Sequence, residues 1–161
     1  MEKLFINEEE LKSMIPTSRN VSDTQTIFYS IKFSQIRELR PHIGERTFDD
    51  LLEKYYTTGY TMTPCELDLV DMMKEVLSLM TYKRLINHLS FKLRDGGLRY
   101  SISGSDELAP TDDRQMILRE ITKDVDVLLG QINIYIKENK DCFPLHSFCR
   151  VGEVKLNIGK L

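Results

Sequence analysis

The sequence has few cysteines, and they do not form a recognisable framework. Its 161 residues include only Cys65, Cys142 and Cys149. An odd and sparse set of this kind is not typical of a small secreted domain held together by disulfides. We therefore expect reduced cysteines that pack as small apolar side chains, in a protein that folds in a reducing compartment.

Long apolar runs are also missing. No stretch approaches the roughly 18 continuous apolar residues of a membrane helix, and residues 1–7 lack the apolar core of a signal peptide. We expect a soluble protein that is made in the cytoplasm and has no membrane partner. The formal net charge is −3, from 22 Lys and Arg against 25 Asp and Glu. This excludes nucleic-acid binding driven by the charge of the whole molecule.

Motifs of catalysis are absent as well. The sequence has no glycine-rich phosphate loop, no Gly-x-Ser-x-Gly elbow and no His-Glu-x-x-His helix. We predict a protein that is not an enzyme and binds no cofactor, with a small helical enzyme as an open alternative. Cys142, His146 and Cys149 could begin a metal site, but zinc usually needs four ligands in paired spacing. We favour apolar packing there and predict no metal.

What the sequence does contain is a succession of helix signals. They predict a mainly α fold, a helical bundle of three shorter and two long helices. The first short helix is expected at Glu8–Met14, capped by Asn7 with Glu10. The second is expected at residues 23–40, ended by Pro41 and Gly44. Its predicted buried stripe, read from the helical spacing, is Tyr29, Phe33, Ile36 and Leu39.

A third short helix is expected to begin at a Thr47 cap. The first long helix should start at Thr63-Pro64-Cys65-Glu66, which places a capping Thr before a Pro and a Glu in the first turn. Its predicted stripe is Leu69, Met73, Val76 and Met80, with Leu77 and Leu85 beside it. The second long helix should start at Thr111 and run toward Pro144. Its predicted stripe is Ile117, Ile121, Val125, Leu128, Ile132 and Ile136.

Two segments differ from this helical pattern. Residues 98–110 form a polar, serine-rich tip loop whose first residues alternate as a short strand would. Residues 147–161 contain apolar residues at alternate positions, which is typical of a half-buried strand. A lone strand leaves backbone groups unpaired, so this tail should pair within the chain or with another molecule. The predicted docking residues of the tail are Val151, Val154, Leu156 and Ile158.

A basic cluster lies at the end of the first long helix and in the segment after it. It contains five basic residues and one acid, Asp95, for a local charge of +4: Lys83, Arg84, Lys92, Arg94 and Arg99. The functional interpretation is a contact with an acidic partner or with nucleic acid. We favour the simpler interpretation, a solvated helix end, because cations suit a helix C-terminus.

The order of several landmarks resembles the helical head–tail connector proteins of tailed bacteriophages, also called adaptor or neck proteins. The landmarks are the opening at residues 4–12, Pro41-His-Ile-Gly44 with the Phe and Leu pair after it, residues 91–98, and Cys142-Phe-Pro144. The likeness is greatest to versions from Bacteroides and crAss-like phages. It covers residues 4–146, which we predict to be the connector domain, with residues 147–161 as a C-terminal extension.

The resemblance implies a structural subunit of the virion neck. Such subunits form a ring, usually a dodecamer, that joins the portal protein to other neck or tail proteins. The ring surrounds the channel through which genome DNA leaves, without specific binding of that DNA. No enzyme activity, metal or cofactor is implied. The alternative is a small helical nucleic-acid-binding or regulatory protein that uses residues 83–99.

Overall fold

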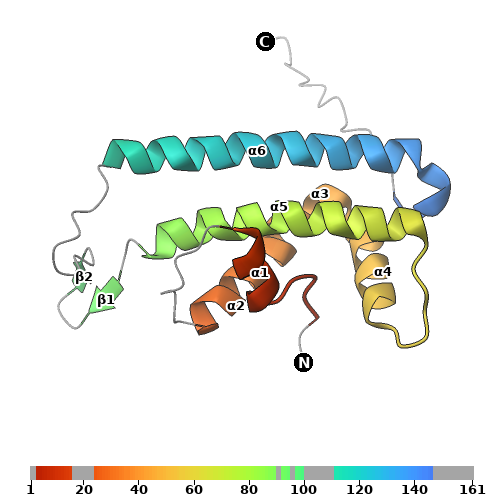
Figure 1. Cartoon of the computed structure of the whole chain (residues 1–161), viewed down its shortest axis with the longest axis horizontal. Helices are drawn as coiled ribbons and strands as arrows, with labels where there is room; N and C mark the ends of the chain where they lie inside the picture. Colours follow the sequence, from red (N-terminus) through yellow and green to blue (C-terminus); the bar gives the residue numbers. More distant parts are fainter. Residues whose placement is uncertain (1–2, 16–23, 90–91, 95–96, 100–110, 147–161) are drawn as a thin grey trace, which may run out of the picture.

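The structure is a computed structural model that describes residues 3–15, 24–89, 92–94, 97–99 and 111–146. Its organising element is the long helix α5 (Pro64–Leu89), which lies between α6 (Thr111–Glu138) and the shorter helices (Figure 1). The remaining elements are α1 (Glu8–Met14), α2 (Thr24–Phe33), the π-helix η1 (Ser34–Leu39), α3 (Arg40–Ile43), α4 (Glu45–Tyr56), β1 (Lys92–Arg94), β2 (Gly97–Arg99) and the 3₁₀ turn η2 (Lys140–Cys142). The mainly helical prediction is confirmed.

The two long helices bury the stripes that face each other. All six apolar residues predicted for α5 are buried, as are Ile121, Val125, Ile132 and Ile136 of α6. Two predicted members of the α6 stripe are wrong, because Ile117 is exposed and Leu129 is buried where Leu128 was expected. Both wrongly predicted residues lie beside the buried stripe, within about 100° of it. This is the angle between successive residues of an α-helix.

The predicted stripe of the second helix is wrong. Tyr29, Phe33 and Ile36 are 63%, 47% and 40% exposed, and only Leu39 of that set is buried. The face that packs toward α5 instead carries smaller side chains, Ile27, Ser30, Ile31, Ser34 and Gln35. Two apolar stripes therefore run along this helix, and the protein buries the less aromatic one.

A π-helical turn explains why this helix passes the predicted stop at Pro41. The backbone N–H of Arg40 donates to the carbonyl of Gln35, five residues earlier. Pro41 has no N–H, and its ring would crowd the carbonyl four residues before it in a regular α-helix. The wider turn accommodates that ring, and the helix continues to Ile43. Gly44 then ends it at a positive φ of 89°.

Two predicted caps are confirmed and one is wrong. Asn7 and Glu10 form a reciprocal capping box, with both hydrogen bonds at 2.9 Å. Thr63 caps α5 together with Glu66. Thr47 does not cap α4, because Gly44 holds the cap position and Thr47 is buried inside the helix. The start of the second helix, expected at residue 23, lies outside the described residues.

The strand predictions are not confirmed. β1 and β2 form a small antiparallel pair that places Leu93 opposite Leu98. Only the first two residues of the segment predicted to alternate, Leu98 and Arg99, lie in β2. The remainder of the tip loop and the entire C-terminal tail lie outside the described residues. None of the described helices has the length and apolar character that crossing a bilayer requires.

Alanine substitutions at two glycines should change the stability of the fold in opposite directions. Gly44→Ala should destabilise the fold by about 1 kcal/mol, because only glycine adopts a positive φ without strain. Gly130→Ala should stabilise α6 by up to about 1 kcal/mol, because a Cβ there would meet no heavy atom within 4 Å. Denaturant unfolding of both variants in dilute protein measures the two changes. A loss of stability in Gly130→Ala would contradict the open environment of that glycine.

Candidate assembly interface

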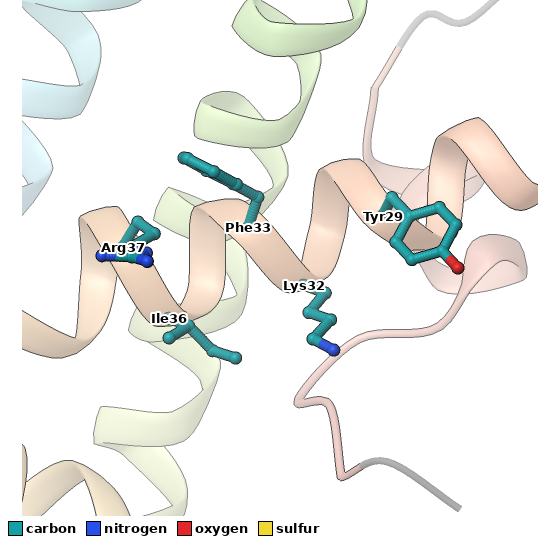
Figure 2. Close-up of a pocket in the computed structure, with 5 residues that line it drawn as sticks. All are labelled: Tyr29, Lys32, Phe33, Ile36 and Arg37. Atoms are coloured by element: carbon teal, nitrogen blue, oxygen red, sulfur yellow. The ribbon is translucent and has the colours of Figure 1, made fainter.

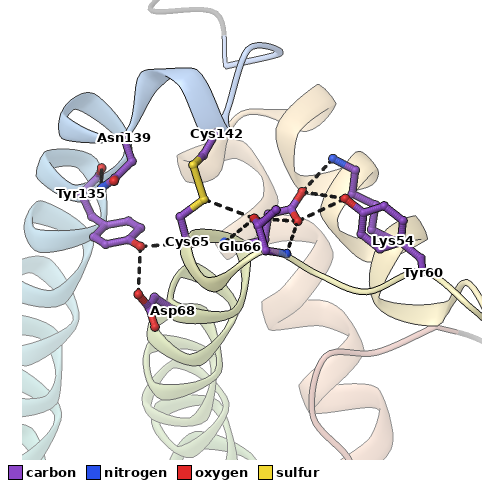
Figure 3. Close-up of a disulfide and its surroundings, with 9 residues drawn as sticks. Lys54, Tyr60, Cys65, Glu66, Asp68, Tyr135, Asn139 and Cys142 are labelled. Atoms are coloured by element: carbon purple, nitrogen blue, oxygen red, sulfur yellow. Dashed lines mark hydrogen bonds and ion pairs between the residues drawn. A yellow bond between two sulfur atoms is a disulfide. The ribbon is translucent and has the colours of Figure 1, made fainter.

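A disulfide connects the start of α5 to η2, the turn that follows α6. Cys65, in the first turn of α5, forms a disulfide with Cys142 of η2, and their Cα atoms are 6.6 Å apart (Figure 3). The prediction of reduced cysteines is therefore wrong for this pair. The chain returns along α6 to bring together cysteines that are 77 residues apart in the sequence. Spacing alone gave no signal of that proximity.

The same disulfide changes the interpretation of the cysteine and histidine cluster. Cys142 is bonded to Cys65, so its sulfur is not available as a thiolate ligand. Cys149 lies outside the described residues. In the part of the chain that is described, no three Cys, His, Asp or Glu side chains group as metal ligands.

Tyr135 of α6 adds a polar contact beside the disulfide. Its hydroxyl lies 3.2 Å from the Asp68 carboxylate and 3.3 Å from the Cys65 carbonyl oxygen. Burial, and then the hydrogen bond and the charge of Asp68, raise the pKa of this phenol above its ordinary value. The phenol therefore stays protonated, as a donor to Asp68 must be.

Glu66 links the start of α5 to α4 in the same region (Figure 3). Its side chain is 4% exposed. It accepts hydrogen bonds from the Thr63 backbone N–H at 2.8 Å, the Thr63 hydroxyl at 2.9 Å and the Lys54 ammonium at 2.8 Å. The Tyr60 hydroxyl approaches to 3.2 Å. These donors use the carboxylate fully, so the cluster holds helices together and offers no free base to a substrate.

The titration of this cluster follows from its hydrogen bonds. Burial acts to raise the pKa of Glu66, but hydrogen bonds from Lys54 and Thr63 outweigh it, and the pKa lies below its ordinary value. Hydrogen bonds to Asp50 and Glu66 raise the pKa of Lys54. Both groups therefore carry their charges at neutral pH.

The structure places the residues of the predicted basic cluster in different environments. The Arg84 guanidinium pairs with Glu38 of η1 and lies over the Phe33 ring, with its central carbon 3.8 Å from the ring centroid. Lys83 instead lines a groove between α5 and α6. Lys92 pairs with Arg99 in the β1–β2 register, and Arg94 pairs with Gly97. The four predicted docking residues of the tail, Val151, Val154, Leu156 and Ile158, lie outside the described residues.

An exposed apolar surface lies on α2 and η1. Its residues were predicted to lie in the core. We name Tyr29, Phe33 and Ile36 the aromatic patch. Together with Lys32 and Arg37 these residues line a shallow depression of about 320 Å³ (Figure 2). Surface apolar residues that occur singly need no explanation, but a contiguous group at helical spacing marks an interaction site.

A second exposed apolar surface lies on α6. We name Met116, Val127 and Ile134 the α6 stripe, and they are 54%, 59% and 56% exposed. At about 100° per residue they fall within about 20° of one another, on the side of the helix opposite its buried residues. Since the buried residues of α6 face α5, the α6 stripe points away from it. The aromatic patch lies on α2 and η1, and Figure 1 shows α2 on the side of α5 opposite α6.

The sequence profile of a family described as "Family of unknown function (DUF6712)" matches residues 39–154. The chain belongs to the DUF6712 family. The match includes both disulfide cysteines and all of the α6 stripe, and it begins after the aromatic patch. It also extends beyond residue 146, where we predicted the connector domain to end. Neither the curated proteins nor the solved structures contain a significant match.

Replacement of Glu66 should lower the free energy of unfolding of this DUF6712 chain at neutral pH. It should also make that free energy depend less on pH in acid. The ionised carboxylate stabilises the fold above about pH 4.5, and this stabilisation is lost as the pH falls through the lowered pKa. Glu66→Gln should reduce the free energy of unfolding at neutral pH by about 1–3 kcal/mol. It should also flatten the loss of stability in acid, measured by urea unfolding across pH. Asp49→Asn, which removes an exposed pair with Arg40, is the control and should change neutral stability less.

Loss of the disulfide should destabilise the fold without changing its helix content. Cys65→Ser or Cys142→Ser should lower the free energy of unfolding by about 2–4 kcal/mol, because the bond closes a long loop in the unfolded chain. Cys149→Ser is the matched control and should leave both stability and the disulfide unchanged. Thermal unfolding and intact mass under non-reducing conditions measure these effects. An equal loss in all three variants would contradict the Cys65–Cys142 pairing.

Proposed function

We propose that this DUF6712 chain is a structural subunit of the head–tail connector ring of a tailed bacteriophage. In this role it joins the portal to the tail and surrounds the channel through which DNA leaves. The ordered sequence landmarks that resemble such connectors support the proposal. The structural observation that carries it is the pair of exposed apolar surfaces, the aromatic patch and the α6 stripe, on different sides of α5.

Two different surfaces suit a ring because of how ring contacts are made. A two-fold dimer uses one self-complementary surface, whereas a ring repeats a head-to-tail contact between two different surfaces of each subunit. The aromatic patch of one copy and the α6 stripe of the next supply such a contact. Burying a large apolar side chain contributes about 1.5–3 kcal/mol, so three residues on each side give a substantial driving force.

A ring also requires that the two surfaces keep a fixed relation within each subunit. The aromatic patch is attached to α5 through the packing of α2, and through Arg84, which contacts both Phe33 and Glu38. The α6 stripe is attached through the buried face of α6, and the disulfide with Cys142 fixes the end of that helix. The angle between neighbouring subunits is then set by the rigid body of one chain.

The proposal also covers the size of the ring, its neighbours in the virion and the role of the C-terminal tail. We propose a ring of about twelve copies in the virion neck, in line with the closed rings that such contacts produce. It would contact the portal above and other neck or tail proteins below. Residues 147–161 would dock as a strand on a neighbouring molecule through Val154, Leu156 and Ile158. The subunit would have no enzymatic role and would let the genome pass without specific binding.

Single charges placed on either surface should prevent assembly. Tyr29→Glu and Val127→Glu each bury a carboxylate in the proposed contact, which costs several kcal/mol when no partner is supplied. Both variants should be monomeric by light scattering under conditions in which the unmodified chain forms closed rings, visible by negative-stain microscopy. Asn133→Glu is the matched control, because it adds the same charge to an exposed position of α6 about 100° from the stripe. It should still form rings.

Mixing the two variants tests the head-to-tail arrangement itself. Tyr29→Glu retains an intact α6 stripe, and Val127→Glu retains an intact aromatic patch. An equal mixture should form dimers that grow no further, because each dimer contains one intact contact and two blocked surfaces. Association of either variant alone would show that its surface pairs with itself. A chain that stays monomeric both alone and with the portal would contradict the proposed function.

The alternative function, nucleic-acid binding through residues 83–99, has less support. Arg84 is partly enclosed between Phe33 and Glu38, so its charge is already compensated within the chain. A gel-shift experiment at physiological salt distinguishes the two functions. Sequence-dependent binding that resists salt would favour the alternative, because contacts with phosphates alone weaken steeply as salt increases.

A further inference from the structure

A groove between α5 and α6 combines three cations with an apolar floor. It has a volume of about 440 Å³, and its lining residues are Lys83, Gln115, Leu118, Arg119, Thr122 and Lys123. The five residues from α6 are spaced as i, i+3, i+4, i+7 and i+8, which places them along one flank of the helix. Lys83 faces them from α5. The groove lies in the half of the helix pair nearer β1 and β2 (Figure 1).

The three cations of this groove have no ion-pair partner among the residues whose side chains are described. Within residues 3–15, 24–87 and 115–146, no hydrogen bond or ion pair joins Lys83, Arg119 or Lys123 to another side chain. Glu120 and Asp124 are neighbours on α6 but do not line the groove. Arg84 and Lys54, by contrast, are paired with acids. The described residues that line the groove therefore carry three positive charges and no negative charge.

We propose that this groove binds an acidic, partly apolar peptide segment of another protein. Three cations around one depression attract carboxylates and raise the rate at which an acidic segment is captured. The half-buried Leu118 and the aliphatic stems of the lysines and the arginine provide apolar surface for the segment's own apolar side chains. The proposal rests on the groove alone and holds whether or not the chain forms a ring.

The composition of the groove favours a peptide over a nucleic acid. Proteins that bind single strands stack the bases on aromatic side chains, and none of the described residues that line this groove is aromatic. Contacts with the backbone of a duplex need cations spread along many phosphates, whereas these three surround one short depression. Leu118 would have no role against phosphates but would contact an apolar peptide side chain.

Fluorescence anisotropy with three labelled peptides tests the proposal on the full chain at a salt concentration near 0.15 M, where exposed charges are partly screened. The first peptide repeats Glu-Glu-Leu, the second replaces every Leu by Ser, and the third replaces every Glu by Lys. We expect the first to bind, the second to bind at least about fivefold more weakly through loss of apolar burial, and the third not to bind. A short DNA duplex is the fourth probe and should bind more weakly than the first peptide.

Variants of the groove complete the test. The double variant Lys83→Glu with Lys123→Glu should weaken binding of the first peptide at least about tenfold, which corresponds to about 1.4 kcal/mol. Lys137→Glu changes the same type of charge on α6 outside the groove and should leave the affinity unchanged. Equal affinity in the double variant, binding of none of the probes, or preference for DNA would each overturn the proposal. Oligomerisation that is lost in the double variant and kept in Lys137→Glu would overturn it in favour of a second copy as occupant. Ring formation without peptide binding would overturn it and leave the proposed function standing.

Discussion

The burial of α5 on two opposite sides is the constraint on which the other features of this fold depend. A helix that packs against α6 on one side and against α1, α2 and η1 on the other needs apolar residues around most of its circumference. Leu69, Val76 and Leu77 are accordingly among its fully buried residues. Because α5 separates the two outer layers, each layer has an outer face directed away from the core. The α6 stripe occupies the outer face of one layer. The aromatic patch is exposed on the other layer, where Arg84 of α5 lies over the Phe33 ring.

The sequence predicted the features that local chemistry determines. The Asn7 and Thr63 caps and the start of α5 follow from side chains that satisfy nearby backbone groups. All six apolar residues predicted for α5 are buried because a helix packed on two sides buries most of its apolar positions. Pro41 misled the prediction for a related reason. The local rule that proline ends a helix is sound, but a π-turn one residue earlier removes the conflict, and periodicity gives no signal of such a turn.

The features that sequence reasoning missed depend on tertiary structure. Tyr29 and Phe33 have larger side chains than Ile27 and Ile31, so a preference for the largest apolar residues selected the wrong face. The face that packs toward α5 includes the small side chains Ser30 and Ser34, and the helical spacing gave no signal that this face would be buried. The cysteine pair was missed for a similar reason, because only the antiparallel return of α6 brings residue 142 next to residue 65. The groove likewise needs Lys83 and Arg119 from separate helices.

The two apolar surfaces and the groove differ in what they can specify. Apolar contacts supply binding energy but discriminate weakly among partners, whereas charges fix register and exclude partners of the same sign. A subunit that used only the aromatic patch and the α6 stripe would associate readily with its own copies, since every copy presents both surfaces. The groove adds a site whose positive charge, on a chain with a net charge of −3, selects a distinct acidic segment. Under the two proposals, self-association and partner choice use separate surfaces, so one small body would make two kinds of contact without competition between them.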